Sequence, residues 1–163
     1  MKQFGLDIGS TTLKYVLLDE RNRLLDSRYA RHGAKIGEKL GEILQRFEQE
    51  FPGEQVLLTI SGSAGLGLSE ALELPFVQEV FAEKLAAERF CPGTDVVIEL
   101  GGEDAKLLFL TGGFEMRMNG TCAGGTGAFI DQMASLMQIT PTQLNDLAAQ
   151  AETIPHIASR CGV

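Results

Sequence analysis

The first residues that could carry chemistry are an acid and a base on either side of a glycine turn near the N-terminus. Asp7 precedes the turn and Lys14 follows it, and the turn itself consists of Gly9, Ser10, Thr11 and Thr12. Such a turn offers backbone N–H and hydroxyl donors, the lysine adds positive charge, and the aspartate can hold a hydrated divalent cation. These features predict a phosphate clamp. The alternative is a polar β-turn without a ligand.

A second acidic, glycine-rich segment covers residues 99–106. It begins with Glu99, ends with Lys106, and contains Gly101, Gly102, Glu103 and Asp104. Two loops of this kind, each at the end of a strand, can converge on one triphosphate, with Asp7 and Glu99 placed to hold Mg²⁺ and to orient an attacking water. For Asp104 and Lys106 a solvated turn is the alternative interpretation.

A third segment, residues 118–129, places one cysteine in a run of small residues with the sequence MNGTCAGGTGAF. Its glycines let the backbone approach a ligand closely, and unpaired N–H groups at the start of the following helix would favour negative charge. The segment therefore suits either a phosphate or a thiolate-bound metal cluster. One chain has only Cys91, Cys122 and Cys161, so a four-thiolate cluster would need two copies.

Composition limits the function classes. The chain has 163 residues, of which 44% are hydrophobic and 22% charged, so we expect one packed α/β domain. The 22 acidic and 14 basic residues give a net charge of −8, which argues against binding to nucleic acid. The sequence shows neither a signal-peptide core nor an apolar run of membrane-spanning length. Cysteines without close pairing fit a reducing compartment, and together these features predict a cytoplasmic protein.

The elements that must position these residues follow from hydrophobic periodicity and turn signals. Strand, turn and strand are predicted over residues 2–19, and a third strand over 24–30 completes an antiparallel meander. Helical periodicity begins at Ile36 and ends at Pro52, and further helices are predicted around residues 77–85, after residue 127, and after an N-cap at Thr140 followed by Pro141. Buried strands are expected at 55–60 and 95–100, with a hairpin formed by 106–110 and 114–118. No internal repeat is evident.

Two segments resemble a known superfamily. GLDIGSTTLKYVLLD resembles the first phosphate loop of the actin, hexokinase and sugar-kinase ATPases, and VIELGGEDAK resembles their second. Within that superfamily, NGTCAGGTGAFIDQMA and the later IASRC resemble one branch. This branch comprises the ATP-dependent activators of 2-hydroxyacyl-CoA dehydratases and the ATPase subunits of benzoyl-CoA reductases. The resemblance covers nearly the whole chain.

The resemblance implies an α/β, ribonuclease-H-like lobe with a mixed sheet and flanking helices. It further implies ATP and Mg²⁺ as ligands, a homodimer, and a [4Fe-4S] cluster that bridges the two subunits through Cys122 and Cys161. ATP hydrolysis in such proteins drives delivery of one low-potential electron from a donor to a dehydratase or reductase. The chain departs from the family at Glu99 and Glu103, where aspartate and glutamine are usual, which affects the expected geometry of water activation.

Some expectations remain beside this interpretation. Residues 1–163 are expected to be the N-terminal lobe of a longer protein, and the lobe alone is expected to bind ATP weakly or not at all. Cys91 is expected to be a small buried hydrophobe, and His32 and His156 to be surface or turn residues. The alternative functions are a non-catalytic lobe used for assembly or nucleotide sensing, and a sugar- or acetate-kinase-like phosphotransferase. The latter would leave Cys122 and Cys161 without a role.

Overall fold

A computed structural model describes residues 1–119 and 125–154 of the chain. The chain divides into two compact units, Met1–Thr94 and Asp95–Val163, which we call unit 1 and unit 2. Unit 1 contains the first predicted phosphate loop, and unit 2 contains the second.

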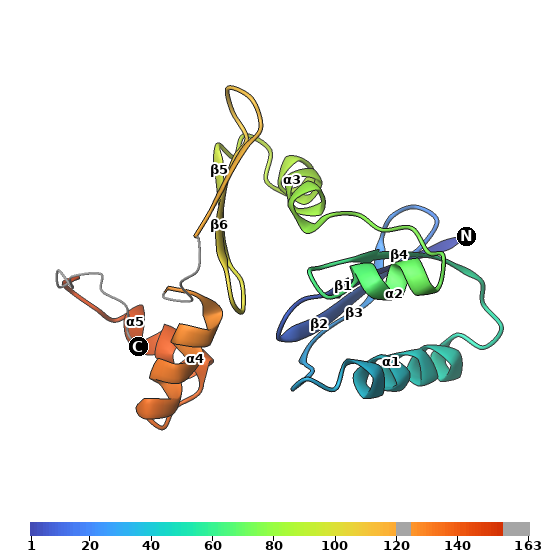
Figure 1. Ribbon diagram of the computed structural model, residues 1–163, viewed down its shortest axis with the longest axis horizontal. Coiled ribbons are helices and arrows are strands. Elements are labelled where there is room, and N and C mark those ends of the chain that lie inside the picture. Colours follow the sequence, from blue (N-terminus) through green and yellow to red (C-terminus); the bar gives the residue numbers. More distant parts are fainter. Residues whose placement is uncertain (120–124, 155–163) are drawn as a thin grey trace. The chain divides into compact units, whose positions relative to one another are not determined.

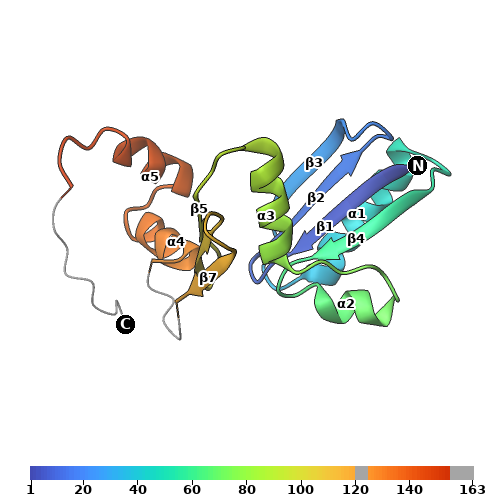
Figure 2. The same ribbon diagram turned by 90° about the horizontal axis from the view of Figure 1, so that it is seen from above.

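Unit 1 is built on a four-stranded mixed sheet with the strand order β3-β2-β1-β4 (Figure 2). β1 pairs with β2 in antiparallel and with β4 in parallel register, and β2 pairs with β3 in antiparallel register. The strands are β1 (Lys2–Ile8), β2 (Thr12–Leu18), β3 (Leu24–Arg31) and β4 (Val56–Ser61). The predicted antiparallel meander is therefore confirmed, and β4 adds the parallel edge of the mixed sheet.

One face of this sheet is covered by helix α1 (Ile36–Glu50), which lies alongside the strands in Figure 1. The period-2 alternation of β1 and β2 directs their apolar side chains to that face, and the 3.6-residue period of α1 meets them. The buried residues of this core are Phe4, Leu6, Ile8, Leu13, Tyr15, Leu17, Ile43 and Ile60. Two further helices follow β4. They are α2 (Leu66–Ala71), which the sequence did not predict, and α3 (Glu79–Phe90).

Tyr15 links this core to a small charged network. Its ring stacks on Phe4, with 5.2 Å between centroids, and its hydroxyl donates to Asp26 Oδ2 at 2.6 Å. Arg46 of α1 lies 3.6 Å from the same carboxylate. Burial, reinforced by the hydrogen bond to Asp26, raises the pKa of Tyr15 to about 12 from its ordinary value of 10. The folded state therefore favours the protonated hydroxyl.

This shift predicts an alkaline stability effect. Because the folded-state pKa is raised, the stabilisation is complete below pH 10 and is lost as the pH rises through about 12. Denaturation by urea at several pH values should therefore show that the free energy of unfolding falls less steeply above pH 10 in Tyr15→Phe than in the wild type. Tyr29→Phe, which removes the hydroxyl of the chain's other, exposed tyrosine, is the control. Identical slopes for Tyr15→Phe and wild type would contradict the prediction.

Unit 2 contains a three-stranded antiparallel sheet with the strand order β5-β6-β7. Its elements are β5 (Val96–Leu100), β6 (Ala105–Phe109), β7 (Glu115–Met118), α4 (Gly127–Leu136) and α5 (Pro141–Ala148). The predicted start of α5 is confirmed as a capping box, in which Gln143 N donates to Thr140 Oγ1 and Thr140 N donates to Gln143 Oε1.

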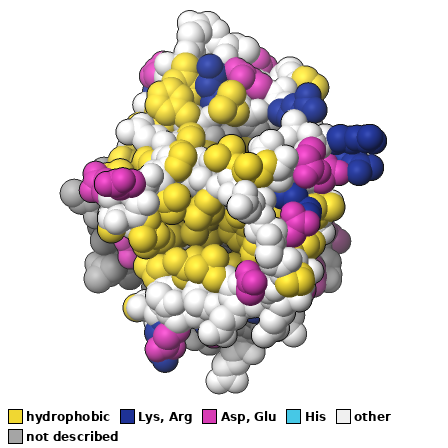
Figure 3. All heavy atoms as spheres, turned by 90° about the vertical axis from the view of Figure 1, so that its right-hand side faces the viewer, with side chains coloured by type: hydrophobic (Ala, Val, Ile, Leu, Met, Phe, Trp, Pro, Cys, Tyr) yellow, Lys and Arg dark blue, Asp and Glu magenta, His cyan; other side chains and the backbone are white. Residues whose placement is uncertain are grey.

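The prediction that residues 95–100 form a buried strand is wrong for the described part of the chain. The strand is present, but Val96, Ile98 and Leu100, which share one face of it, are exposed because no described side chain covers them. Other hydrophobic side chains of both units also lie at the surface, and Figure 3 shows hydrophobic side chains exposed in one view. Within the described residues, no helix combines the length and the apolar character that crossing a bilayer requires.

Candidate functional site: two acid–glycine–lysine hairpins

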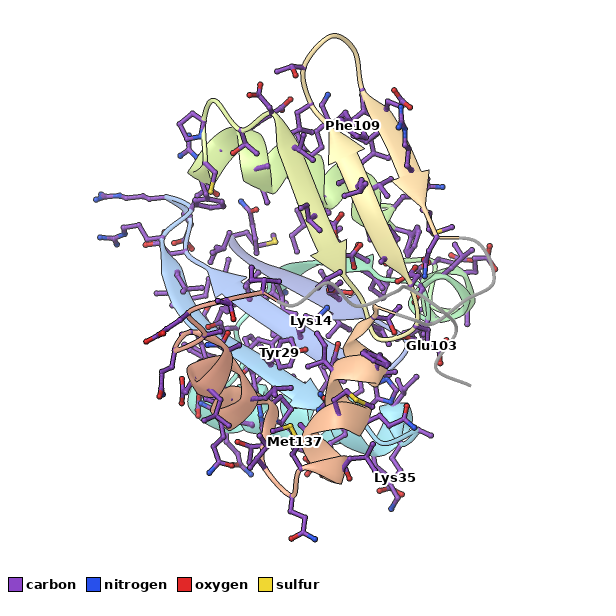
Figure 4. All side chains as sticks on the ribbon, turned by 90° about the vertical axis from the view of Figure 1, so that its left-hand side faces the viewer. Lys14, Tyr29, Lys35, Glu103, Phe109 and Met137 are labelled. Carbon is purple, nitrogen blue, oxygen red and sulfur yellow. The ribbon has the colours of Figure 1, made fainter. Side chains whose placement is uncertain are left out.

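The first candidate site is the hairpin that joins β1 to β2 in unit 1. Asp7 and Lys14 are directly opposite each other in the antiparallel register, and Lys14 Nζ donates to Asp7 Oδ2 at 2.7 Å. Both side chains are 38% exposed, so the pair is accessible to a ligand. Lys14 Nζ also lies 5.8 Å from the centroid of the Tyr29 ring, and Figure 4 shows these two side chains side by side. The structure thus pairs two of the predicted site residues.

The turn between them, residues 9–12, is closed by a hydrogen bond from Gly9 N to Thr12 O at 2.9 Å. Within the described residues, the N–H groups of Ser10 and Thr11 have no hydrogen-bond acceptor. Thr12 is buried, whereas Ser10 and Thr11 are partly exposed. The N–H groups of Ser10 and Thr11 are therefore the backbone donors that this turn can offer to an anion.

A neighbouring loop after β4 supports the end of β1, a role that the sequence did not reveal. Ala64 N donates to Ile8 O at 2.9 Å, and Gly65 N donates to Gly62 O at 3.0 Å. Gly62 has a φ of +92°, and a Cβ there would lie well under 3.0 Å from Ile8 O and from Asp7 Oδ1. Only glycine lets this loop approach the carboxylate so closely. The one sequence signal was the run of small residues after β4.

His32 is a turn residue, which was one of the two predicted alternatives, because Lys35 N donates to His32 O at 2.8 Å. Its side chain is not at the surface but is buried in unit 1. It directly follows β3, and its ring contacts the phosphate loop, with Nε2 3.1 Å from Gly9 O. The surface alternative is wrong because, although a polar residue at a strand end is usually exposed, this one replaces solvent as the partner of a loop carbonyl.

The second candidate site is the hairpin that joins β5 to β6 in unit 2. Glu99 and Lys106 are opposite each other in register, and Lys106 Nζ donates to Glu99 Oε2 at 2.8 Å. The ammonium also lies 3.2 Å from Asp104 Oδ2. Lys106 is only 4% exposed, so a solvated turn is excluded as the description of this lysine. One buried ammonium therefore faces two carboxylates, and the cluster carries a net negative charge.

The glycines of the second loop serve a local structural purpose. Gly127 N and Ala128 N, at the start of α4, donate to Gly101 O at 2.7 Å and to Gly102 O at 3.0 Å. The expectation of unpaired N–H groups at this helix end is thus wrong for these two residues, because the second loop already accepts their hydrogen bonds. A Cβ at Gly101 would crowd Asp104, whose Oδ1 lies well under 3.0 Å from that position and whose backbone oxygen lies 3.1 Å from it. Glu103 occupies the same turn.

The two hairpins repeat one design, although no repeat was evident from the sequence. In each, an acid near the end of the first strand pairs with a lysine seven residues later on the second strand, and a glycine follows two residues after the acid. The side chains between them differ, which hides the repeat from inspection. The shared register shows it, because Asp7 faces Lys14 as Glu99 faces Lys106.

The predicted metal ligands Cys122 and Cys161 lie outside the described residues. Cys91, at the end of α3, is exposed and not the small buried residue that was expected. No described residue covers its side chain, since α3 ends there and the chain turns. In residues 1–119 and 125–154, no group of three or more His, Cys, Asp or Glu side chains is arranged to hold a metal ion.

Comparison with known proteins identifies the family to which the chain is similar. The model of the BadF/BadG/BcrA/BcrD ATPase family matches residues 4–163. The chain is 26% identical to the (R)-2-hydroxyglutaryl-CoA dehydratase activating ATPase of Acidaminococcus fermentans over 98% of its own length and 62% of the relative's.

Solved structures show the same fold. The crystal structure of the (R)-2-hydroxyglutaryl-CoA dehydratase component A of Acidaminococcus fermentans matches this chain with a TM-score of 0.83 and 24% identity. The match covers 99% of this chain and 63% of the component A chain. The activator of the 2-hydroxyisocaproyl-CoA dehydratase from Clostridium difficile, with bound ADPNP, matches 99% of this chain and 61% of its own, with a TM-score of 0.81 and 26% identity. The chain thus spans less than two thirds of these proteins. These structural matches confirm the predicted actin- and hexokinase-like fold. Because the family model matches nearly the whole chain, the chain belongs to the BadF/BadG/BcrA/BcrD ATPase family.

Proposed function

We propose that the chain is the N-terminal lobe of an ATP-hydrolysing iron–sulfur activator, which delivers a low-potential electron to a 2-hydroxyacyl-CoA dehydratase or a related CoA-ester reductase. The proposed ATP binding and hydrolysis rest on the repeated acid–glycine–lysine hairpin, which occurs once in each unit. The relatives named as dehydratase activators support the choice of partner.

In the first hairpin, the N–H groups of Ser10 and Thr11 would donate to phosphate oxygens, assisted by their hydroxyls and by the Lys14 charge. Gly9 lets the phosphate approach the backbone. Asp7 is the residue that would hold Mg²⁺, since carboxylates are its preferred protein ligands and this one is accessible. Mg²⁺ would supply charge neutralisation on the phosphates when it is bound.

In the second hairpin, Glu99 would orient the attacking water, with Lys106 fixing the position of one carboxylate oxygen. Gly101 and Gly102 keep that loop close to the start of α4, and Glu103 and Asp104 complete its acidic face. Because the cluster holds two carboxylates for one ammonium, it favours a cation over an additional anion. This preference fits a role beside a metal–phosphate complex.

The donor set for iron is limited by cysteine number. Each chain has three cysteines, and the chain's resemblance to the activator branch assigns Cys122 and Cys161 to the cluster. Two copies of the chain would then supply the four thiolates of a [4Fe-4S] cluster, which makes the homodimer part of the proposal. Such a cluster supplies one-electron chemistry when it is bound.

Anaerobic reconstitution with iron and sulfide tests the iron part. We expect about four irons per dimer in the wild type and loss of this iron in Cys122→Ser, because a serine hydroxyl is a poor ligand for the cluster. Cys91→Ser is the matched control and should keep its iron, since Cys91 is an exposed thiol with no proposed role. A full-length protein that binds ATP but stays colourless would refute the iron–sulfur function and favour a nucleotide-binding lobe or a phosphotransferase.

A further inference from the structure

We propose that His32 is a positioning residue that holds the first phosphate loop, residues 9–12, in the conformation that binds a nucleotide phosphate. This inference rests on the nucleotide-binding function proposed above. His32 lies directly after β3 and is only 4% exposed, although its side chain is polar. A buried imidazole of this kind needs a hydrogen-bond partner at each ring nitrogen, and both partners are present.

The residue holds the loop at two points. Its backbone N–H donates to Thr11 O at 3.2 Å, and its ring nitrogen Nε2 lies 3.1 Å from Gly9 O. The bond from Gly9 N to Thr12 O closes the turn itself. Three carbonyl groups of the loop are therefore engaged, two of them by the single residue His32.

The contacts also determine where the proton sits on the ring. Ala34 N donates to His32 Nδ1 at 3.1 Å, so Nδ1 must carry a lone pair. In the neutral imidazole the proton is then on Nε2, and Nε2–H donates to Gly9 O, which can only accept. Gly33 and Ala34 have φ values of +54° and +63°, and this left-handed segment directs the Ala34 N–H back to the ring.

The link to Gly9 O matters because of peptide geometry. The carbonyl of Gly9 and the N–H of Ser10 belong to one planar trans peptide unit and point in opposite directions. When His32 holds the carbonyl, it directs the Ser10 N–H away from the imidazole. Within the described residues this N–H has no acceptor, so it is available to a phosphate oxygen. Without the Nε2 contact the peptide unit can rotate, and the donor loses its direction.

Two substitutions separate positioning from simple packing, because each keeps a different half of the ring's hydrogen bonding. In His32→Gln the side-chain amide nitrogen reaches the position of Nε2 and keeps a donor for Gly9 O. In His32→Asn the amide oxygen takes the position of Nδ1 and keeps the acceptor for Ala34 N, but the donor to Gly9 O is lost. Calorimetric titration of the full-length protein, of which this chain is the proposed N-terminal lobe, with Mg·ADPNP should give a dissociation constant roughly tenfold higher for the asparagine variant and within about twofold of wild type for the glutamine variant.

The outcomes distinguish this inference from the proposed function. A full-length protein that fails to bind Mg·ADPNP refutes the nucleotide-binding function itself. If the wild type binds and the two variants have equal affinities, the Nε2 contact does not position the loop and the inference is wrong. A nitrogen NMR spectrum of the wild type supplies a check that does not depend on variant folding. The chain has two histidines, so the missing signal in His32→Gln assigns His32, and an Nδ1–H tautomer there would overturn the inference.

Discussion

In the full-length protein, replacing Asp7 by asparagine is expected to lower the rate of ATP hydrolysis by about 100-fold or more. The substitution keeps the shape of the side chain but removes the negative charge that would hold Mg²⁺. It also leaves Lys14, whose Nζ lies 2.7 Å from the carboxylate, without its ionic partner. Because this pair is 38% exposed, the freed ammonium can be solvated, and the fold should persist. Phosphate release from ATP with Mg²⁺ present measures the effect, and circular dichroism checks folding.

A second ion pair serves as the control for the loss of a salt bridge. Glu38→Gln breaks the pair with Lys35 on α1, where Nζ and Oε2 are 3.1 Å apart and both side chains are well exposed. This variant should hydrolyse ATP at the wild-type rate, since a pair of this kind contributes little to stability and lies outside the proposed site. Activity of Asp7→Asn within about threefold of wild type would show that Asp7 does not hold the catalytic metal.

The two hairpins share the same strand register but differ in the number and the exposure of their charged side chains. Asp7 and Lys14 form a single half-exposed pair, so the carboxylate can exchange its lysine for a metal ion. Lys106 is buried between Glu99 and Asp104, which makes this ammonium difficult to displace. We infer that the first hairpin supplies the exchangeable ligand and the second supplies a fixed acidic surface. Glu99 contacts its lysine at 2.8 Å.

Sequence patterns predicted the elements that depend on neighbours along the chain. The pairing of β1 with β2, the helix α1 and the capping box at Thr140 all follow from periodicity or from local turn chemistry, which the residues display directly. The acidic residues and lysines of both hairpins could be chosen for the same reason, because the turn fixes which residues face each other.

The features that escaped prediction depend on contacts between distant segments. His32 contacts Gly9, 23 residues earlier, and Gly62 fits against Asp7, far away in the sequence. No local pattern indicates that a histidine replaces solvent at a loop carbonyl, or that a glycine is needed beneath a carboxylate. The exposed face of β5 was not predicted for a similar reason. An apolar sequence predicts a buried strand, but whether the described residues cover that strand depends on distant segments.

Gly62→Ala is expected to destabilise unit 1 by more than about 3 kcal/mol. Two effects combine there, because φ is +92° and a Cβ would collide with the backbone oxygen of Ile8 and with Asp7 Oδ1. Gly93→Ala separates backbone strain from steric collision, since Gly93 has a similar φ of +86° but no neighbouring atom within reach of a Cβ. This substitution should lower the free energy of unfolding by only about 1 kcal/mol. Urea denaturation followed by circular dichroism measures both variants. Equal destabilisation would mean that backbone strain alone accounts for Gly62, whereas a larger loss for Gly62→Ala would show that the close packing of this loop against Ile8 O and Asp7 Oδ1 adds a steric cost.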